Sequence, residues 1–224
     1  MLKNIAKIPP RAARFAARLR GCESGLAFVE FALSLPVLVT LSLVGLETAH
    51  LAMAHLRISN IAMIASDNAA RVRDNIDEAN VIELLVGAKM TGDNIRFKQN
   101  GRIILSSVEP NTAGTGGAST GQWIRWQRCD GAKNVVSSYG PQGTGQTNAS
   151  LQAVGAPGNQ IAATSGTAIM LVEVVYDYQP LVSTSIFGAR QIRYESAFNV
   201  RQRTNQALSN NGGATPKSCT VFTA

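Results

Sequence analysis

Residues 26–46 read LAFVEFALSLPVLVTLSLVGL, a run of 21 positions that contains one charged residue, Glu30. At about 1.5 Å per residue this run makes a helix of roughly 32 Å, close to the thickness of the hydrocarbon core of a bilayer. Six basic residues and one acidic residue precede it within residues 1–25. Because basic residues flank membrane helices on the cytoplasmic side, we expect the N-terminus to stay in the cytoplasm and the rest of the chain to cross.

The positive charge of the chain is concentrated at its N-terminus. The formal net charge is +7, of which residues 1–25 carry +5 and the remainder +2. A nearly neutral remainder lacks the basic surface that nucleic acids require, so we interpret the charge as a topology signal and predict no nucleic-acid partner. The 224 residues are enough for one domain and an anchor, and 16% charged residues is a low content for a soluble protein.

A cleavable secretory signal peptide is the alternative interpretation of the same segment. Such a peptide also begins with basic residues, and LAMA at residues 51–54 resembles a small-residue cleavage site. The apolar run is longer than the ~7–15 residues usual in signal peptides, and it contains Glu30. Both features favour a single-pass membrane helix.

Glu30 is an unusual residue for such a helix, because a charge at mid-membrane costs about 2.5–3.5 kcal/mol on insertion scales. Its position near the cytoplasmic end lowers that cost, and one alternative is that it reaches the interface and has no further role. If the bond between Gly25 and Leu26 were cut, Glu30 would become residue five and Leu26 would carry a positively charged α-amine. Glu30 of one subunit could then pair with the amine of another, which would fix the register between packed helices.

The stretch GLAFVEF resembles the processing site of type IV prepilins, in which a basic leader and a glycine precede an apolar segment with glutamate at its fifth position. The wider pattern AxVEFALxLPxL is more narrowly similar to the TadE/TadF pseudopilin-like proteins of the tight-adherence (Flp, type IVb/IVc) pilus system. The resemblance covers roughly residues 20–70. The matching positions are Ala27, Val29, Glu30, Phe31, Ala32, Leu33, Leu35, Pro36 and Leu38.

This resemblance implies a minor pseudopilin or pilus assembly protein of the bacterial inner membrane, which has no cofactor and is not an enzyme. A prepilin peptidase would cut between Gly25 and Leu26, and Glu30, Phe31 and Pro36 would serve assembly. The implied partners are that peptidase, other pilin or pseudopilin subunits, and the inner-membrane assembly platform. The C-terminal domain would lie in the periplasm or, after assembly, in the pilus. An unprocessed membrane-anchored periplasmic binding or adhesive module is the alternative.

The pattern of the whole chain predicts an α+β protein with a long N-terminal transmembrane and stem helix and a pilin-like head with an antiparallel sheet. Apolar residues recur every three or four positions after residue 50, so the helix is expected to span 26–73, with Pro36 able to bend it. A second helix is expected at 76–89, with Asn75 or Asp77 as N-cap. The predicted segments are a basic leader at 1–25, a transmembrane helix at 26–46, a helical stem and second helix at 47–90, the head at 91–206 and a tail at 207–224.

Five strands are expected in the head. The dipeptide Asn100-Gly101 predicts a hairpin within NIRFKQNGRIILSSVEP at residues 94–110. The remaining strands are expected at 122–129, 167–182 and 189–203. Residues 137–166 are rich in Gly, Ser, Thr and Asn, which predicts a long exposed loop.

Two of the three cysteines are expected to form a disulfide. Cys22 lies in the leader on the reducing side, whereas Cys129 and Cys219 fall in the exported part, where an oxidising compartment favours a bridge. Two free or intermolecular thiols are the alternative. The tail from about residue 207 is expected to be weakly ordered unless Cys219 holds it.

The head carries no recognisable catalytic or metal-binding motif. GxSxG, P-loop, HExxH and CxxC patterns do not occur in the sequence. His50 and His55, the only histidines, are five residues apart with no cysteine beside them, so we predict no metal site and place them at the membrane–water boundary. Glu173 and Asp177 would lie about 13 Å apart along one strand face, too far for a carboxylate pair.

Overall fold

The computed structural model describes residues 24–112, 120–155 and 158–223. The predictions for the basic leader and for Cys22 therefore lie outside the described residues. The chain divides into two compact units, Met1–Thr48 and Ala49–Ala224. Helix α2 (Ser24–Arg71) contributes to both units and ends two residues before the predicted boundary.

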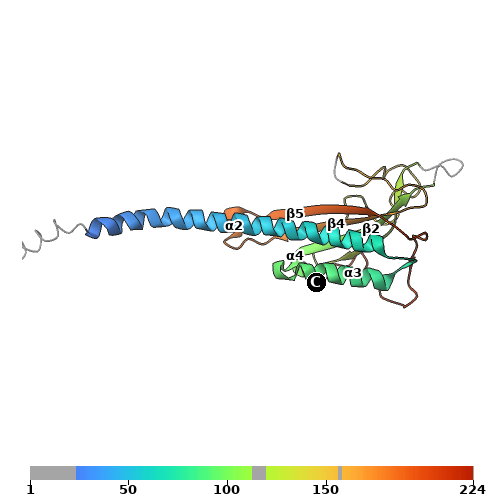
Figure 1. Cartoon of the computed structure of the whole chain (residues 1–224), viewed down its shortest axis with the longest axis horizontal. Coiled ribbons are helices and arrows are strands. Elements are labelled where there is room, and N and C mark those ends of the chain that lie inside the picture. Colours follow the sequence, from blue (N-terminus) through green and yellow to red (C-terminus); the bar gives the residue numbers. More distant parts are fainter. Residues whose placement is uncertain (1–23, 113–119, 156–157, 224) are drawn as a thin grey trace, which may run out of the picture. The chain divides into compact units, whose positions relative to one another are not determined.

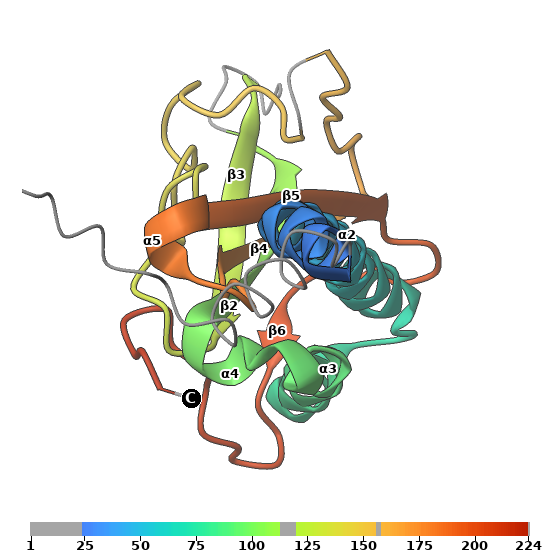
Figure 2. The same ribbon diagram turned by 90° about the vertical axis from the view of Figure 1, so that its left-hand side faces the viewer.

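The second unit is built on a four-stranded antiparallel sheet in the order β3-β2-β4-β5, which confirms the α+β class (Figure 1). The end-on view in Figure 2 shows α2 and α3 beside this sheet. The strands are β2 (Gly101–Pro110), β3 (Gln122–Asp130), β4 (Ile169–Tyr178) and β5 (Arg190–Asn199). The other elements are β1 (Ile76–Asp77), α3 (Glu78–Thr91), η1 (Asp93–Ile95), α4 (Phe97–Asn100), α5 (Thr184–Phe187) and β6 (Leu208–Ser209).

The main core lies between the helices and one face of the sheet. Strand β4 alternates, so that its even-numbered residues from Met170 to Tyr178 join this core. Helix α2 contributes a face of small residues to the same core, among them Ala62, Ala65 and Ala69, and its Ser66 hydroxyl lies 2.8 Å from that of Ser196 in β5. The strands predicted at 167–182 and 189–203 are present as the shorter β4 and β5.

The opposite face of the sheet is covered by the segment that was predicted to be an exposed loop. Leu151, Val154 and Ala163 of this segment are buried in a second apolar cluster with Val108 and Ile124 of the sheet. Two isolated bridges, Gln122 with Leu151 and Val154 with Ile161, fix its path. The prediction of an exposed loop is wrong for these positions, because a few apolar residues in a Gly- and Ser-rich segment are enough to anchor it on an apolar surface.

The predicted hairpin at Asn100-Gly101 is also wrong. Residues 93–100 form the short helices η1 and α4, and β2 begins only at Gly101. The apolar alternation of Ile95 and Phe97 looks like a strand, but both side chains are buried from consecutive helical turns, and Phe97 stacks on Tyr176 with ring centroids 6.1 Å apart. Burial of Phe97 thus outweighs the local turn preference of the dipeptide, and the main sheet has four strands instead of five.

Helix α3 is capped by Asp77, one of the two predicted N-caps, and it spans Glu78–Thr91, two positions later than the predicted 76–89. The Asp77 side chain accepts a hydrogen bond from the Ala79 N–H (3.0 Å), and Asn80 Oδ1 accepts one from the Asp77 N–H (3.1 Å). Backbone N–H groups of Ala79 and then Asn211 lower the pKa of Asp77. Because β1 also pairs in parallel with β6, Asp77 holds the C-terminal tail as well as the helix.

The sequence Asn100-Gly101 gives a direct test of this local fold. A β-carbon on Gly101 would overlap the ring of Phe97, so we expect Gly101→Ala to lower the free energy of unfolding by about 1–3 kcal/mol through overpacking. Asn100 only donates from its exposed side-chain amide to the Arg96 carbonyl, and Asn100→Ala should change stability by less than about 0.5 kcal/mol. Urea unfolding of the full chain in detergent, followed by tryptophan fluorescence, measures both. A larger loss in Asn100→Ala would instead indicate a turn at the dipeptide.

Candidate functional site

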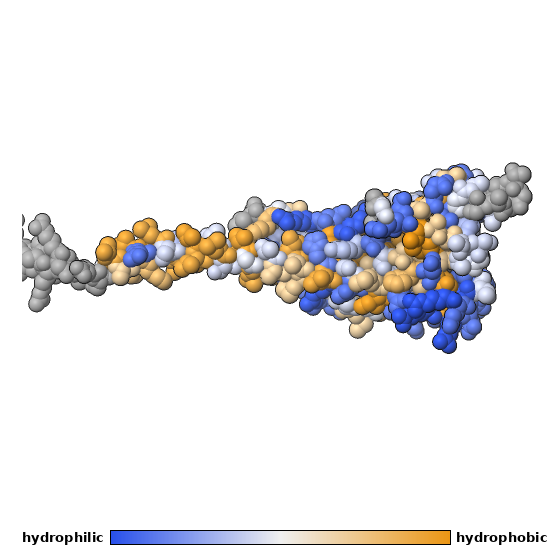
Figure 3. Space-filling view, turned by 45° about the horizontal axis from the view of Figure 1, so that its top comes forward, coloured by the Kyte–Doolittle hydropathy of each residue, from blue (hydrophilic) through white to orange (hydrophobic). Residues whose placement is uncertain are grey.

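The first unit presents an unbroken apolar surface. Residues 25–46 of α2 are all exposed, and their large apolar side chains show 40–72% of their surface. Figure 3 shows this segment as a mainly hydrophobic stretch. Among the described residues, α2 is the one helix long and apolar enough to cross a membrane, and none of its apolar window is buried. A surface of this kind requires a nonaqueous environment or a partner.

The polar groups within this segment are mostly satisfied by the helix itself. The hydroxyl groups of Ser34, Thr40 and Ser42 donate to the carbonyls of Phe31 (3.0 Å), Pro36 (2.7 Å) and Leu38 (2.8 Å). Such bonds to the preceding turn remove the penalty of exposing hydroxyl groups to hydrocarbon. The segment is therefore compatible with a lipid environment despite its serine and threonine content.

The sequence-predicted processing and assembly residues all lie on this surface. Gly25, Leu26, Glu30, Phe31 and Pro36 are within α2 and exposed. Leu26 and Glu30 are four residues apart, so they occupy the same helix face. In the described part of the chain, the Glu30 carboxylate makes no hydrogen bond or ion pair, which leaves its charge available to another group.

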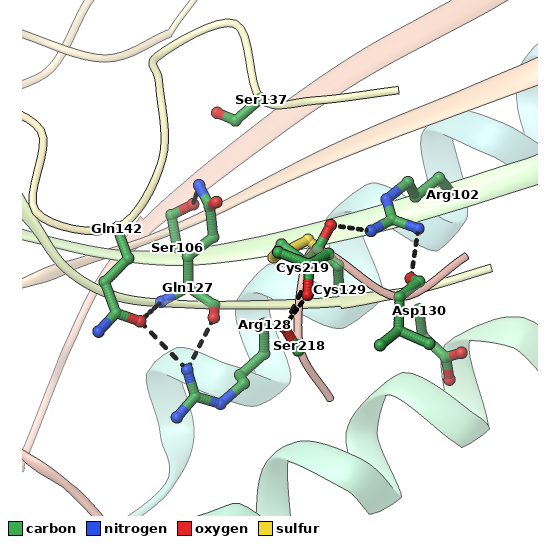
Figure 4. Close-up of a disulfide and its surroundings, with 12 residues drawn as sticks. Arg102, Ser106, Gln127, Arg128, Cys129, Asp130, Ser137, Gln142, Ser218 and Cys219 are labelled. Carbon is green, nitrogen blue, oxygen red and sulfur yellow. Dashed lines mark hydrogen bonds between the residues drawn. A yellow bond between two sulfur atoms is a disulfide. The ribbon is translucent and has the colours of Figure 1, made fainter. Parts of the chain in front are cut away.

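Cys129 of β3 and Cys219 of the tail form a disulfide with a Cα–Cα distance of 4.7 Å, the pairing that the sequence suggests (Figure 4). Beside it, the buried Arg102 donates hydrogen bonds to the carbonyls of Cys219 (2.7 Å), Val221 (3.1 Å) and Gly131 (2.9 Å). Burial lowers the pKa of Arg102, although the charge of Asp130 opposes this shift. The tail is thus held by a covalent bond and by a buried cation, a contact that sequence reasoning missed.

Two acids of β4, Glu173 and Asp177, are each matched with a cation. Glu173 is fully buried and meets Arg193 (3.1 Å), while Asp177 forms an ion pair with Lys133. The two carboxylates therefore serve separate ion pairs, in agreement with their predicted separation. Within residues 24–112, 120–155 and 158–223, no group of three or more His, Cys, Asp or Glu residues could hold a metal ion.

The two histidines contact tyrosines of the sheet. His50 Nδ1 lies 2.8 Å from the Tyr178 hydroxyl, and the rings of His55 and Tyr194 meet edge to face at 5.9 Å. Sequence reasoning missed these contacts. Part of the signal was present, because both tyrosines fall within predicted strands and both histidines fall within the predicted stem helix.

A cluster of acids lies where the loop after β3 meets the sheet. Glu173 and Glu195 are direct neighbours across β4 and β5, an arrangement that is unfavourable for like charges. The Ser138 N–H (2.8 Å) and the Ser137 hydroxyl donate to Glu173, and the Tyr139 hydroxyl donates to Glu195 (2.6 Å). Burial and then the bond to Glu195 raise the pKa of Tyr139 to about 12. These bonds fasten the loop while offsetting the repulsion.

Comparison of the chain with protein-family models, with curated proteins and with solved structures found no match in any of the three. Function must therefore be inferred from the residues of this chain. The exposed apolar segment with Glu30 and the disulfide-bonded tail are the most informative of them.

The raised pKa of Tyr139 predicts a measurable pH dependence. An unfolded tyrosine has a pKa of about 10, so the folded state holds this proton more tightly, and stability should fall as the pH rises from about 10 to about 12. The variant Tyr139→Phe should be less stable at pH 8 through the lost hydrogen bond. Its stability deficit should shrink across the alkaline window. Urea midpoints at several pH values measure this deficit, and a constant deficit would contradict the assignment.

Proposed function

We propose that this protein is a minor pseudopilin or assembly protein of the TadE/TadF type, anchored in the bacterial inner membrane and acting in a tight-adherence pilus system. The observation that carries the proposal is the exposed apolar helical segment whose one charge, Glu30, lies five positions after Gly25. An ordinary anchor needs no carboxylate at this depth, and such residues usually mark function. The leader sequence and the pattern around Pro36 support the same family.

The physical role proposed for Glu30 depends on processing. Removal of residues 1–25 creates a charged α-amine on Leu26, one helical turn before Glu30. In an array of parallel helices, the carboxylate of one subunit can pair with the amine of its neighbour at a fixed axial offset. An isolated chain leaves Glu30 unpaired in the membrane, so pairing favours assembly and sets the register.

The disulfide supports export of the head. A bridge between Cys129 and Cys219 is stable in an oxidising compartment and uncommon in the cytoplasm. The basic residues before Gly25 favour a cytoplasmic N-terminus. Together they support a single-pass topology with the head in the periplasm, where it could meet other pilus subunits.

The mature N-terminus tests the proposal. We expect the membrane-bound form purified from cells that contain a prepilin peptidase to begin at Leu26 in mass spectrometry. The variant Gly25→Leu should keep residues 1–25, because a large side chain obstructs the peptidase, and the fold should be unaffected since a β-carbon at Gly25 meets no neighbour. A wild-type protein that retains its leader would favour the alternative, an unprocessed anchored binding or adhesive module.

A second prediction concerns assembly. Glu30→Gln should leave membrane insertion intact, as judged by carbonate extraction, because it removes the charge without shortening the apolar segment. Incorporation into sheared pili should fall by about tenfold or more, since breaking a desolvated ion pair costs about 3–5 kcal/mol. Glu83→Gln is the matched control, because Glu83 is exposed on α3. Equal piliation in both variants would show that Glu30 is merely tolerated.

A further inference from the structure

A pocket of 330 Å³ opens at the end of the sheet where β4 leads toward β5. Its walls include His50 from α2, Asn94 and Arg96 from the turn before α4, and Gln179 and Leu181 from the segment after β4. All of these residues belong to the second unit. The volume is at the lower end of that of ligand pockets, ~300–1,000 Å³, and the lining carries several hydrogen-bonding groups and one cation.

Arg96 is the unmatched charge of this pocket. Its side chain is exposed, and in the described ranges its guanidinium makes no hydrogen bond or ion pair. The acids on the neighbouring elements are already occupied, since Asp93 pairs with Lys98 (3.1 Å) and Asp177 pairs with Lys133. A guanidinium with no acidic partner favours an anionic ligand, and its planar geometry suits two oxygens of a phosphate.

The backbone holds Arg96 in a conformation that an arginine rarely adopts. Its φ of 55° is left-handed, a region that costs a non-glycine residue roughly 1–2 kcal/mol. The turn is fixed by the Arg96 N–H, which donates to the Asp93 carbonyl (3.1 Å), and by the Tyr176 hydroxyl, which donates to the Ile95 carbonyl (2.7 Å). Glycine would adopt this backbone conformation without strain. The presence of an arginine here therefore suggests that its side chain has a role.

The pocket is tied closely to the apolar segment by the chain itself. His50 follows Leu46, the last residue of that segment, by four positions. Four residues span at most about 14 Å, so this wall of the pocket stays near the end of the segment whatever the orientation of the two units. Leu181, at the same pocket, exposes 57% of its surface.

We propose that this pocket binds the phosphate group of an anionic phospholipid in the periplasmic leaflet of the membrane. Arg96 pairs with the phosphate, Asn94 donates a hydrogen bond, and Leu181 contacts the acyl region. His50 engages Tyr178 through Nδ1, and when Nδ1 accepts that hydroxyl proton, Nε2 carries the ring proton and donates to the ligand. The proposal rests on the membrane anchoring in the proposed function, and it is independent of processing and of pilus assembly.

The test is a lipid titration of the full chain in detergent micelles, read as the rise in unfolding temperature. Dioctanoyl-phosphatidylglycerol should stabilise the wild type, and dioctanoyl-phosphatidylcholine should do so much less. Arg96→Gln should weaken the phosphatidylglycerol effect by about tenfold, as expected for loss of one charge-assisted contact. Arg73→Gln is the matched control, since it removes the same charge from an exposed site roughly 30 Å from His50 along α2 and its terminus.

The variant Arg96→Gly controls for misfolding of the Arg96→Gln variant, because glycine adopts the left-handed turn without strain. It should bind lipid as poorly as Arg96→Gln while folding at least as stably as the wild type. Equal lipid responses of the Arg96 and Arg73 variants would overturn the proposal. Inorganic phosphate that stabilises the wild type as well as phosphatidylglycerol does at equal concentration would also overturn it, by indicating a site for free anions.

Flotation of the full chain with liposomes separates the two proposals. If the protein does not float, membrane anchoring is wrong, and the phosphatidylglycerol proposal fails with it. If the protein floats but the Arg96 and Arg73 variants respond alike to the lipids, anchoring stands and only the pocket assignment is wrong.

Discussion

The apolar core shared by α2, α3 and one face of the sheet is the feature on which the head depends. Ala62, Ala65 and Ala69 of α2 share this core with Val172 and Val174 of β4, and α3 adds Val81 and Leu85. The buried face of α2 does not extend into the apolar segment 26–46, where every residue is exposed. One helix therefore carries two kinds of apolar surface, one buried within the chain and one that requires a nonaqueous environment or a partner.

The opposite face of the sheet buries charged side chains beside the apolar cluster to which Leu151, Val154 and Ala163 belong. Arg102 and Glu173 are buried there. Arg102 donates to carbonyls of the tail and of Gly131, and Glu173 binds Arg193 of β5 and two serines of the loop after β3. A buried ion pair adds little net stability, but removal of one partner leaves an uncompensated buried charge and strongly destabilises the fold. The disulfide at Cys219 restricts the conformations of the unfolded chain. It also keeps the carbonyl acceptors of Arg102 in place in the folded state.

The features that local sequence dictates were predictable, and those set by distant contacts were not. Periodicity predicts the long helix and the strands β3, β4 and β5. Capping chemistry predicts an N-cap near Asp77, and two cysteines outside the predicted leader suggest the Cys129–Cys219 pair. The burial of Leu151 and Val154 depends on an apolar surface contributed by Ile124 and other sheet residues, which no local pattern reveals. The contact of His50 with Tyr178 joins residues 128 positions apart, so it needs the strand register as well as the helix position.

The failed hairpin prediction is informative because of where it occurred. Local preference and tertiary packing tend to disagree at strained or functional sites. At residues 93–101, packing of Phe97 on Tyr176 replaces a turn with two short helices and forces Arg96 into a left-handed conformation. The same rearrangement puts the unpaired guanidinium beside His50, at the point where the chain leaves its apolar segment. A regular hairpin would have placed residue 96 within a strand. The packing of Phe97 on Tyr176, which overrides the turn preference of Asn100-Gly101, therefore also creates the pocket that contains Arg96.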